Sequence, residues 1–151
     1  KKANDKDIKL LETFWKKMGS KVDIMDAKQH DYILSITSHI PHLIAYNIVN
    51  TSIDIDGEKE SKIIKYSAGG LRDFTRIAAS NPIMWRDIFL LNKTNTSKAI
   101  DNFILNLQDL KEAIQKGDGK KLEEIFIKTK KIRKSIIEAG QDVKKPDFGR
   151  R

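Results

Sequence analysis

The sequence predicts an all-α domain, preceded by the last helix and strand of an α/β domain. From residue 27 onward, apolar residues recur with the 3.6-residue period of helices, and almost no stretch alternates as a strand does. Residues 1–26 show one helix pattern followed by one short strand pattern, and a lone strand is not stable. With 39% hydrophobic residues, the 151-residue chain can bury a core. We therefore divide it into an α/β remnant at 1–26 and a helical domain at 27–151.

Local signals predict both elements of the remnant. A helix is expected over residues 6–19 (KDIKLLETFWKKMG), capped by Asn4 or Asp5, and Gly19 is suited to end it. Residues 21–26 (KVDIMD) then alternate apolar and polar side chains, which predicts a short strand. Because a strand needs neighbours that these residues do not provide, we expect the chain to be a piece of a longer protein.

The helical domain is expected to begin with a long helix from about Lys28 to Ser52, which contains Pro41. Proline has no backbone N–H, and its ring pushes away the carbonyl four residues earlier, here that of Thr37. We therefore predict a kink, with polar backbone groups freed among apolar side chains. Such a kink is suited to the wall of a pocket.

The elements after this helix are separated by loop-forming residues. We expect a loop near residues 54–61, and a Gly-Gly break that divides residues 61–80 into two helices. The next helix carries Pro82 near its first position, with Ser80 or Asn81 as the N-cap.

Two long amphipathic helices complete the domain, the first ending at Gly117 or Gly119 and the second at Gly140, before an irregular tail. None of the eight glycines approaches the spacing of a phosphate-binding loop. If the protein uses a nucleotide cofactor, the residues that bind it lie outside this sequence, and no cofactor-binding residue is assigned here.

The composition excludes several classes of chemistry. Cysteine is absent, which excludes disulfides, thiolate catalysis and cysteine zinc sites, and fits the reducing cytoplasm. No apolar run approaches the ~20 residues of a membrane span. The formal charge is +8, but acidic residues are interleaved with the basic ones. We interpret the excess as solvated helix faces, and expect no nucleic-acid or membrane partner.

All three histidines fall within 13 residues, at His30, His39 and His42. On a helix, Ser38 and His42 share a face, and His39 lies about 60° from His42. A zinc site needs three or four ligands, and His30 falls on the far side of the helix, so no metal site is expected. Two interpretations stay open for His39 and His42: hydrogen-bonded histidines at a packing interface, or binding of a substrate.

A second polar cluster follows the Gly-Gly break. Gly69 and Gly70 precede a helix N-terminus, where free N–H groups and the helix dipole favour an anion. Arg72 and Arg76 share a helix face, and an arginine there can bind a carboxylate in bidentate fashion. Asp73 can instead hold Arg76 in an ordinary helix ion pair, and spacing alone favours this second interpretation.

Trp85 and Phe89 lie four residues apart on the following helix. Two aromatic residues at this spacing share one face of a helix. Spacing alone therefore favours a place in the core over a platform on which a ligand stacks.

The two stretches that carry these residues resemble the prephenate dehydrogenase family. They are HDYILSITSHIPHLIAYNIVN at 30–50 and GGLRDFTRIAASNPIMWRDIF at 69–89, in the order expected of that family. The S-H-x-P-H and D-F-T-R-I-A patterns are specific in combination. Residues 10–31 resemble the segment that leads from the family's nucleotide domain into its helical domain.

The resemblance implies an N-terminal Rossmann-type domain that binds NAD or NADP, and a C-terminal all-helical domain that dimerises by interlocking helices. The reaction it implies is oxidative decarboxylation of prephenate, or of arogenate, in the cleft between the domains. A hydride passes from ring C4 to nicotinamide, CO₂ departs and a 4-hydroxyphenyl product forms. The implied partners are a second copy of the chain and the small-molecule substrate.

The resemblance also implies roles for individual residues. By position, His42 contacts the substrate, Arg76 binds a substrate carboxylate, Ser38 shares the pocket and Trp85 lies near it. The turn that approaches the neighbouring subunit's site comprises Gly69, Gly70 and Asp73. His39 is expected to be structural. The family's catalytic histidine, which takes the C4 hydroxyl proton, belongs to the N-terminal domain, so no catalytic residue is expected here and this chain alone is expected to be inactive.

Two other functions are compatible with the composition. One is a non-enzymatic helical interaction module, which could bind nucleic acid through its +8 charge with a steep salt dependence. The interleaved acids and the lack of a basic recognition helix disfavour it. The other is a helical dehydrogenase domain with a different small carboxylate as substrate, which the match to two motifs disfavours.

Overall fold

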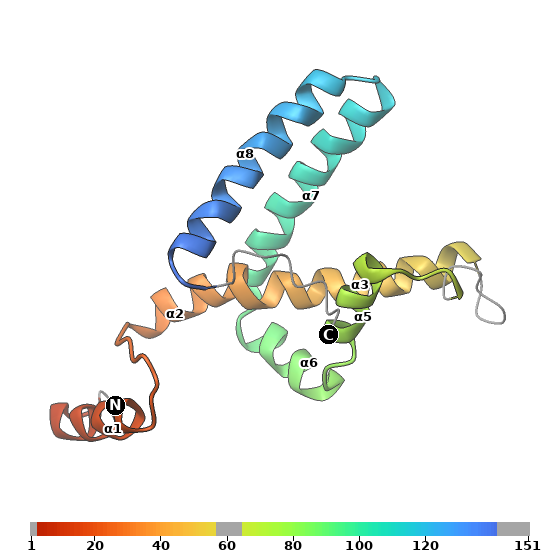
Figure 1. The fold of residues 1–151 in the computed structure, drawn as a ribbon. Coiled ribbons are helices and arrows are strands. Elements are labelled where there is room, and N and C mark those ends of the chain that lie inside the picture. Colours follow the sequence, from red (N-terminus) through yellow and green to blue (C-terminus); the bar gives the residue numbers. More distant parts are fainter. Residues whose placement is uncertain (1–2, 57–64, 142–151) are drawn as a thin grey trace.

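The computed structural model describes residues 3–56 and 65–141, and the regular elements in this part of the chain are all helices (Figure 1). This confirms the all-α fold class. None of these helices is both long enough and apolar enough to cross a membrane. In chain order the elements are α1 (Asp5–Lys17), α2 (Ala27–Leu34), the π-helical segment η1 (Ser35–His39), α3 (Ile40–Asp56), α5 (Gly69–Ala78), α6 (Pro82–Leu91), α7 (Lys93–Gln115) and α8 (Gly119–Glu138).

A single continuous rod, formed by α2, η1 and α3, supports the rest of the domain (Figure 1). Helix α5 packs along α3, and α7 contacts the rod at η1. Helices α7 and α8 form an antiparallel hairpin that extends away from the rod, while α6 lies on the rod's other side. Helix α1 stands apart near the start of the rod. The rod therefore carries the helices that surround the histidines.

The helix predicted from about residue 28 continues through Pro41, which lies inside α3, and the kink predicted there does not break the rod. The irregular part is the π segment, which ends two residues before the proline. The N–H of Ile40 donates to the carbonyl of Ser35, five residues earlier, instead of the usual four. A π turn holds one extra residue, which rotates the side chains that follow relative to those before. Within η1, Ser35 and His39 are the buried residues.

Helix ends follow the predicted caps. Asn4 caps α1 by accepting a hydrogen bond from the N–H of Asp7. Asn81 caps α6 by accepting from the N–H groups of Ile83 and Met84, with Pro82 at the first helical position. Three helices end before a glycine with positive φ, which other residues adopt at a cost: Gly19 (87°), Gly117 (66°) and Gly140 (71°).

The strand predicted for residues 21–26 does not form, and this segment is irregular. A strand is stabilised by hydrogen bonds to a neighbouring strand, and the described residues offer no such neighbour. Two other boundaries also differ from the expectation. Helix α3 continues to Asp56, and α5 begins at Gly69 itself, with Ala68 as its N-cap. Most of the predicted loop at 54–61, the start of the next short helix and the predicted tail from residue 142 lie outside the described residues.

Very little of the apolar surface is buried within one chain. The described hydrophobic residues that are buried are Ala45, Trp85 and Ala113. The accessible surface is 13271 Å², against about 7,800 Å² for a compact monomer of this mass. Large apolar side chains are exposed on both helices of the hairpin, among them Leu105, Leu107, Ile114, Phe126 and Ile132. These faces are suited to contact another surface.

Gly117 provides a direct test of the hairpin turn. Because its φ is +66°, replacing it with alanine forces a side chain into the left-handed region and should lower the free energy of unfolding by about 1 kcal/mol. Gly119→Ala is the matched control, since Gly119 begins α8 without a positive φ and has open space around it. Urea unfolding at one protein concentration measures both, and an equal effect at the two positions would contradict the assignment of the turn.

Candidate functional site

His42 and Trp85 form an aromatic stack between α3 and α6. Their ring centroids lie 3.7 Å apart and their planes differ by 22°. Trp85 is only 5% exposed, while His42 is partly buried. His42 lies in the first turn of α3, directly after Pro41, and Trp85 lies in the first turn of α6, which Asn81 caps. Trp85 is therefore in the core, as its spacing predicted, and also supports one face of the histidine ring.

The orientation of the His42 ring is fixed by Ser38. The Nδ1 atom of His42 lies 2.9 Å from the carbonyl oxygen of Ser38, an acceptor, so Nδ1 carries the proton and donates it. This contact joins His42 to the backbone of Ser38, so the role predicted for the Ser38 side chain stays a prediction. The Nε2 atom forms no hydrogen bond with the described residues. His42 is thus held by one of its two ring nitrogens.

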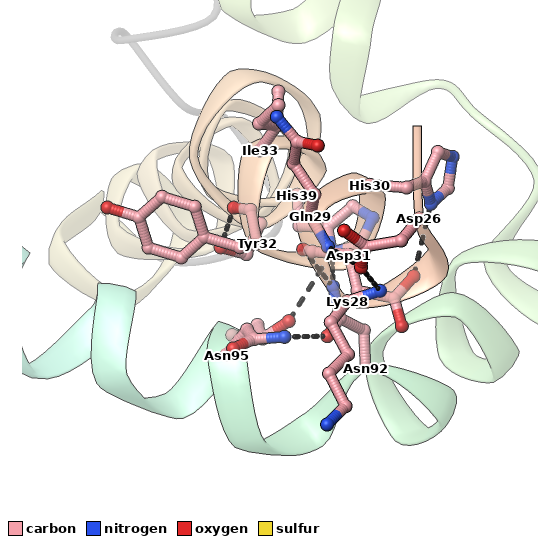
Figure 2. Close-up of polar contacts among 12 residues, drawn as sticks. Asp26, Lys28, Gln29, His30, Asp31, Tyr32, Ile33, His39, Asn92 and Asn95 are labelled. Carbon is pink, nitrogen blue, oxygen red and sulfur yellow. Dashed lines mark hydrogen bonds and ion pairs between the residues drawn. The ribbon is translucent and has the colours of Figure 1, made fainter. Parts of the chain in front are cut away.

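His39 is buried on the opposite side of the stack, at the junction between α6 and α7. It is 6% exposed, and its Nδ1 atom lies 3.3 Å from Nδ2 of Asn92 and 3.4 Å from the hydroxyl of Thr96. An amide NH₂ can only donate, so Nδ1 of His39 accepts and its proton resides on Nε2. Asn92 also donates to the carbonyl of Asp31 on the rod and accepts from Asn95, which lies beside it in Figure 2.

Burial lowers the pKa of the His39 imidazole below its ordinary value. The carboxylate of Asp31 opposes this shift, whereas the imidazoles of His30 and His42 add to it. Because burial dominates, His39 is neutral near pH 7. This agrees with its role as a hydrogen-bond acceptor, and the packing interpretation describes it well.

A groove of about 690 Å³ runs between α3 and α6 next to the stack. Trp85 belongs to both the stack and the groove. Tyr46 is anchored by a hydrogen bond of 2.7 Å from its hydroxyl to the carbonyl of Ser80, which ties α3 to the end of α5. The groove is lined by apolar and aromatic side chains, two amides and one guanidinium. These residues are Leu43, Tyr46, Asn47, Asn50, Pro82, Trp85, Arg86 and Phe89.

The predicted residues of α5 do not join the stack within one chain. Gly69 and Gly70 are the first two residues of α5, whose N-cap Ala68 provides no side-chain hydrogen bond. Asp73 and Arg76 are exposed, and neither forms a hydrogen bond or ion pair with the described residues. The helix pair that spacing favoured for Asp73 and Arg76 is therefore not formed, and none of these four residues lines the groove.

His30 takes no part in this site. It lies on the exposed surface of α2, where its Nδ1 atom is 3.1 Å from a carboxylate oxygen of Asp31. Within residues 3–56 and 65–141, no three His, Cys, Asp or Glu side chains gather closely enough to hold a metal ion. The three clustered histidines thus occupy three different environments.

Sequence reasoning missed two groups of residues at this site. Tyr46 and Asn50 continue the four-residue spacing from His42 along α3, a signal that was available from the sequence. Asn92 and Thr96 are 53 and 57 residues from His39, and no local pattern links residues so distant.

The comparisons with known proteins place this arrangement in a family. Residues 26–128 match the family model described as prephenate dehydrogenase, dimerization domain. Cyclohexadienyl dehydrogenase of Zymomonas mobilis is 37% identical over 129 residues, covering 85% of this chain and 44% of that protein. Prephenate dehydrogenase of Bacillus subtilis is 30% identical over 136 residues, covering 89% of this chain and 36% of that protein.

A solved structure gives the same result. The crystal structure of prephenate dehydrogenase from Aquifex aeolicus, in complex with hydroxyphenyl propionate and NAD+, superposes with a TM-score of 0.81 at 43% identity. The match covers 90% of this chain and 47% of that one. The chain therefore spans less than half the length of the relatives it matches.

The buried state of His39 predicts a pH dependence of stability. Folding lowers the pKa of the His39 imidazole, so its contribution to the free energy of unfolding is complete above the pKa of the unfolded chain, 6.5. This contribution is lost as the pH falls through 6.5 toward the lower pKa of the folded chain. We expect the free energy of unfolding to decrease from pH 7 to pH 5. In His39→Gln the slope should be shallower, by at most about 1.4 kcal/mol per pH unit. Urea titrations at fixed protein concentration measure this, and an unchanged slope would refute the assignment.

Proposed function

The chain belongs to the prephenate dehydrogenase family, and from this premise we propose that it is the C-terminal helical part of an NAD(P)-dependent prephenate or arogenate dehydrogenase. Its task is to form the dimer and to bind the carboxylates of the substrate. The nucleotide, NAD or NADP, is bound mainly by an N-terminal domain outside residues 27–151, and accepts the hydride when bound. We expect the chain alone to be inactive, because the proton-abstracting histidine also belongs to that domain.

The observation that carries the proposal is the His42–Trp85 stack. Trp85 covers one face of the imidazole and Ser38 holds its Nδ1 atom, so Nε2 is presented in a fixed direction with no other partner in the described residues. A fixed nitrogen of this kind can accept a hydrogen bond from a hydroxyl, or donate one when protonated. Binding to such a preorganised group needs little reordering.

The start of α5 supports binding of an anion. Its first N–H groups have no side-chain cap, and the positive end of the helix dipole lies there. A side chain built on Gly69 or Gly70 would meet nothing within 4 Å, so another molecule has room to approach. Prephenate is a dianion, and the free guanidinium of Arg76 can pair with a carboxylate in bidentate fashion. We propose that Asp73 and this turn approach the site of the neighbouring subunit.

The open apolar faces support the homodimer. The hairpin exposes apolar side chains on both helices, and near its turn Leu122, Phe126 and Ile127 line a shallow groove on α8. Burying such side chains favours association by about 25 cal/mol per Å² of apolar surface. We propose that a second copy covers these faces, with the helices of the two copies interlocked.

The dimer can be tested at Phe126, which is 56% exposed. The unaltered chain should sediment as a dimer at micromolar concentration. Phe126→Asp should weaken the dimer at least about tenfold, because it removes apolar contact and adds a charge. Thr13→Asp on exposed α1 adds the same charge outside the matched region and is the control. A monomer of the unaltered chain would count against the proposal.

The role of Arg76 can be tested in the complete enzyme. Arg76→Ala should raise KM for prephenate by about tenfold or more, since a charged hydrogen bond contributes about 1.5–3 kcal/mol. KM for the nucleotide should stay the same. Arg72→Ala is the matched control, because Arg72 is also exposed and lies one turn earlier on α5. Equal effects of the two variants on KM for prephenate would refute the role of Arg76.

A further inference from the structure

A buried polar cluster supports the stack from behind, and the proposed function leaves it without a role. It consists of His39 from the π segment, with Asn92 and Thr96 from the junction of α6 and α7. All three are at most 8% exposed. Polar groups are costly to bury, and a cluster of apolar residues would fill the same volume without that cost.

Asn92 connects the cluster to two parts of the fold. Its Nδ2 atom donates to the carbonyl of Asp31 on the rod at 2.7 Å, and lies 3.3 Å from Nδ1 of His39. Its Oδ1 atom accepts from Asn95 at 2.9 Å, which fixes which end of the amide faces His39. Asn92 therefore sets both the position of the helix junction and the rotation of the His39 ring.

The His39 ring in turn contacts the ring that supports His42. It meets Trp85 edge-on, with centroids 6.2 Å apart and planes at 80°, and it meets Phe89 at 6.3 Å and 88°. The Nε1 atom of Trp85 is buried without a hydrogen-bond partner among the described residues. No polar contact of its own thus orients the indole, and its tilt depends on the rings packed against it.

We propose that Asn92 and His39 are positioning residues that hold Trp85, and through it His42, in the orientation that binds the substrate. This inference rests on the proposed function, because it requires His42 to contact the substrate. A hydrogen bond to one nitrogen of an imidazole fixes the orientation of the ring plane. A phenylalanine in the same place has no polar atom that could fix its ring plane in this way. The hydrogen bond from Asn92 to His39 thereby explains why this position behind the stack is polar.

A double-mutant cycle in the complete enzyme tests the proposal. A residue that acts through His42 should lose its effect once His42 is removed, whereas a general weakening of the fold should add to any background. His39→Phe keeps a ring but loses the acceptor for Asn92. We expect it to raise KM for prephenate about tenfold in the unaltered enzyme, and less than about twofold in a His42→Ala background. KM for the nucleotide should stay unchanged in both.

A second variant and a control complete the experiment. Asn92→Asp keeps the shape of the side chain but replaces the donor with an acceptor. It should give the same pattern of KM values, and it tests the proposal on its own if His39→Phe fails to fold. Asn102→Ala, exposed on the same helix α7, should leave every KM unchanged. Equal rises in both backgrounds, or no rise, would overturn the positioning role while the proposed function stands. If His42→Ala alone leaves KM for prephenate unchanged, the proposed function fails and this inference fails with it.

Discussion

The π turn that precedes Pro41 is the feature on which the site depends. Within the rod, the N–H of Ile40 reaches back five residues to the carbonyl of Ser35, directly before a proline that has no backbone N–H to donate. His39 lies in this π turn and is buried at the helix junction, while His42 follows on the first turn of α3. The two rings then contact Trp85 in different ways, one edge-on and one face to face.

A second constraint is the scarcity of buried apolar surface within one chain. Three described hydrophobic residues are buried, and two of them are alanines. Around the stack, long-range polar contacts such as Asn92 to Asp31 and Tyr46 to Ser80 link the elements instead. Contacts of this kind fix geometry better than they add stability, because each bond replaces one that water would make. The geometry of the site is therefore set by directional hydrogen bonds more than by burial of apolar surface.

Sequence reasoning succeeded where the signal is local. Asn4 and Asn81 cap the predicted helices, and Gly117 and Gly140 end them. The strand at 21–26 was predicted wrongly, since strand formation depends on a neighbour that a local pattern does not contain.

The site shows the same division. The contact between His42 and Ser38 follows from their four-residue spacing, whereas the stack on Trp85 and the bond from Asn92 to His39 join residues from different helices. The resemblance named His42 and Trp85 but carried no information on their mutual geometry. Roles that concern the substrate stay predictions.

Helix α7 links two regions with different tasks. Its first turn holds Thr96 against His39, and Asn92 directly precedes it, whereas its later turns carry exposed apolar side chains toward the tip of the hairpin. A helix of 23 residues is a stiff rod about 34 Å long. Because the helix moves as one rigid body, a tilt imposed near Gln115 is transmitted to the first turn, where Thr96 lies. A surface that covers the hairpin and shifts α7 would therefore also shift Thr96, and with it the His39 ring behind the stack.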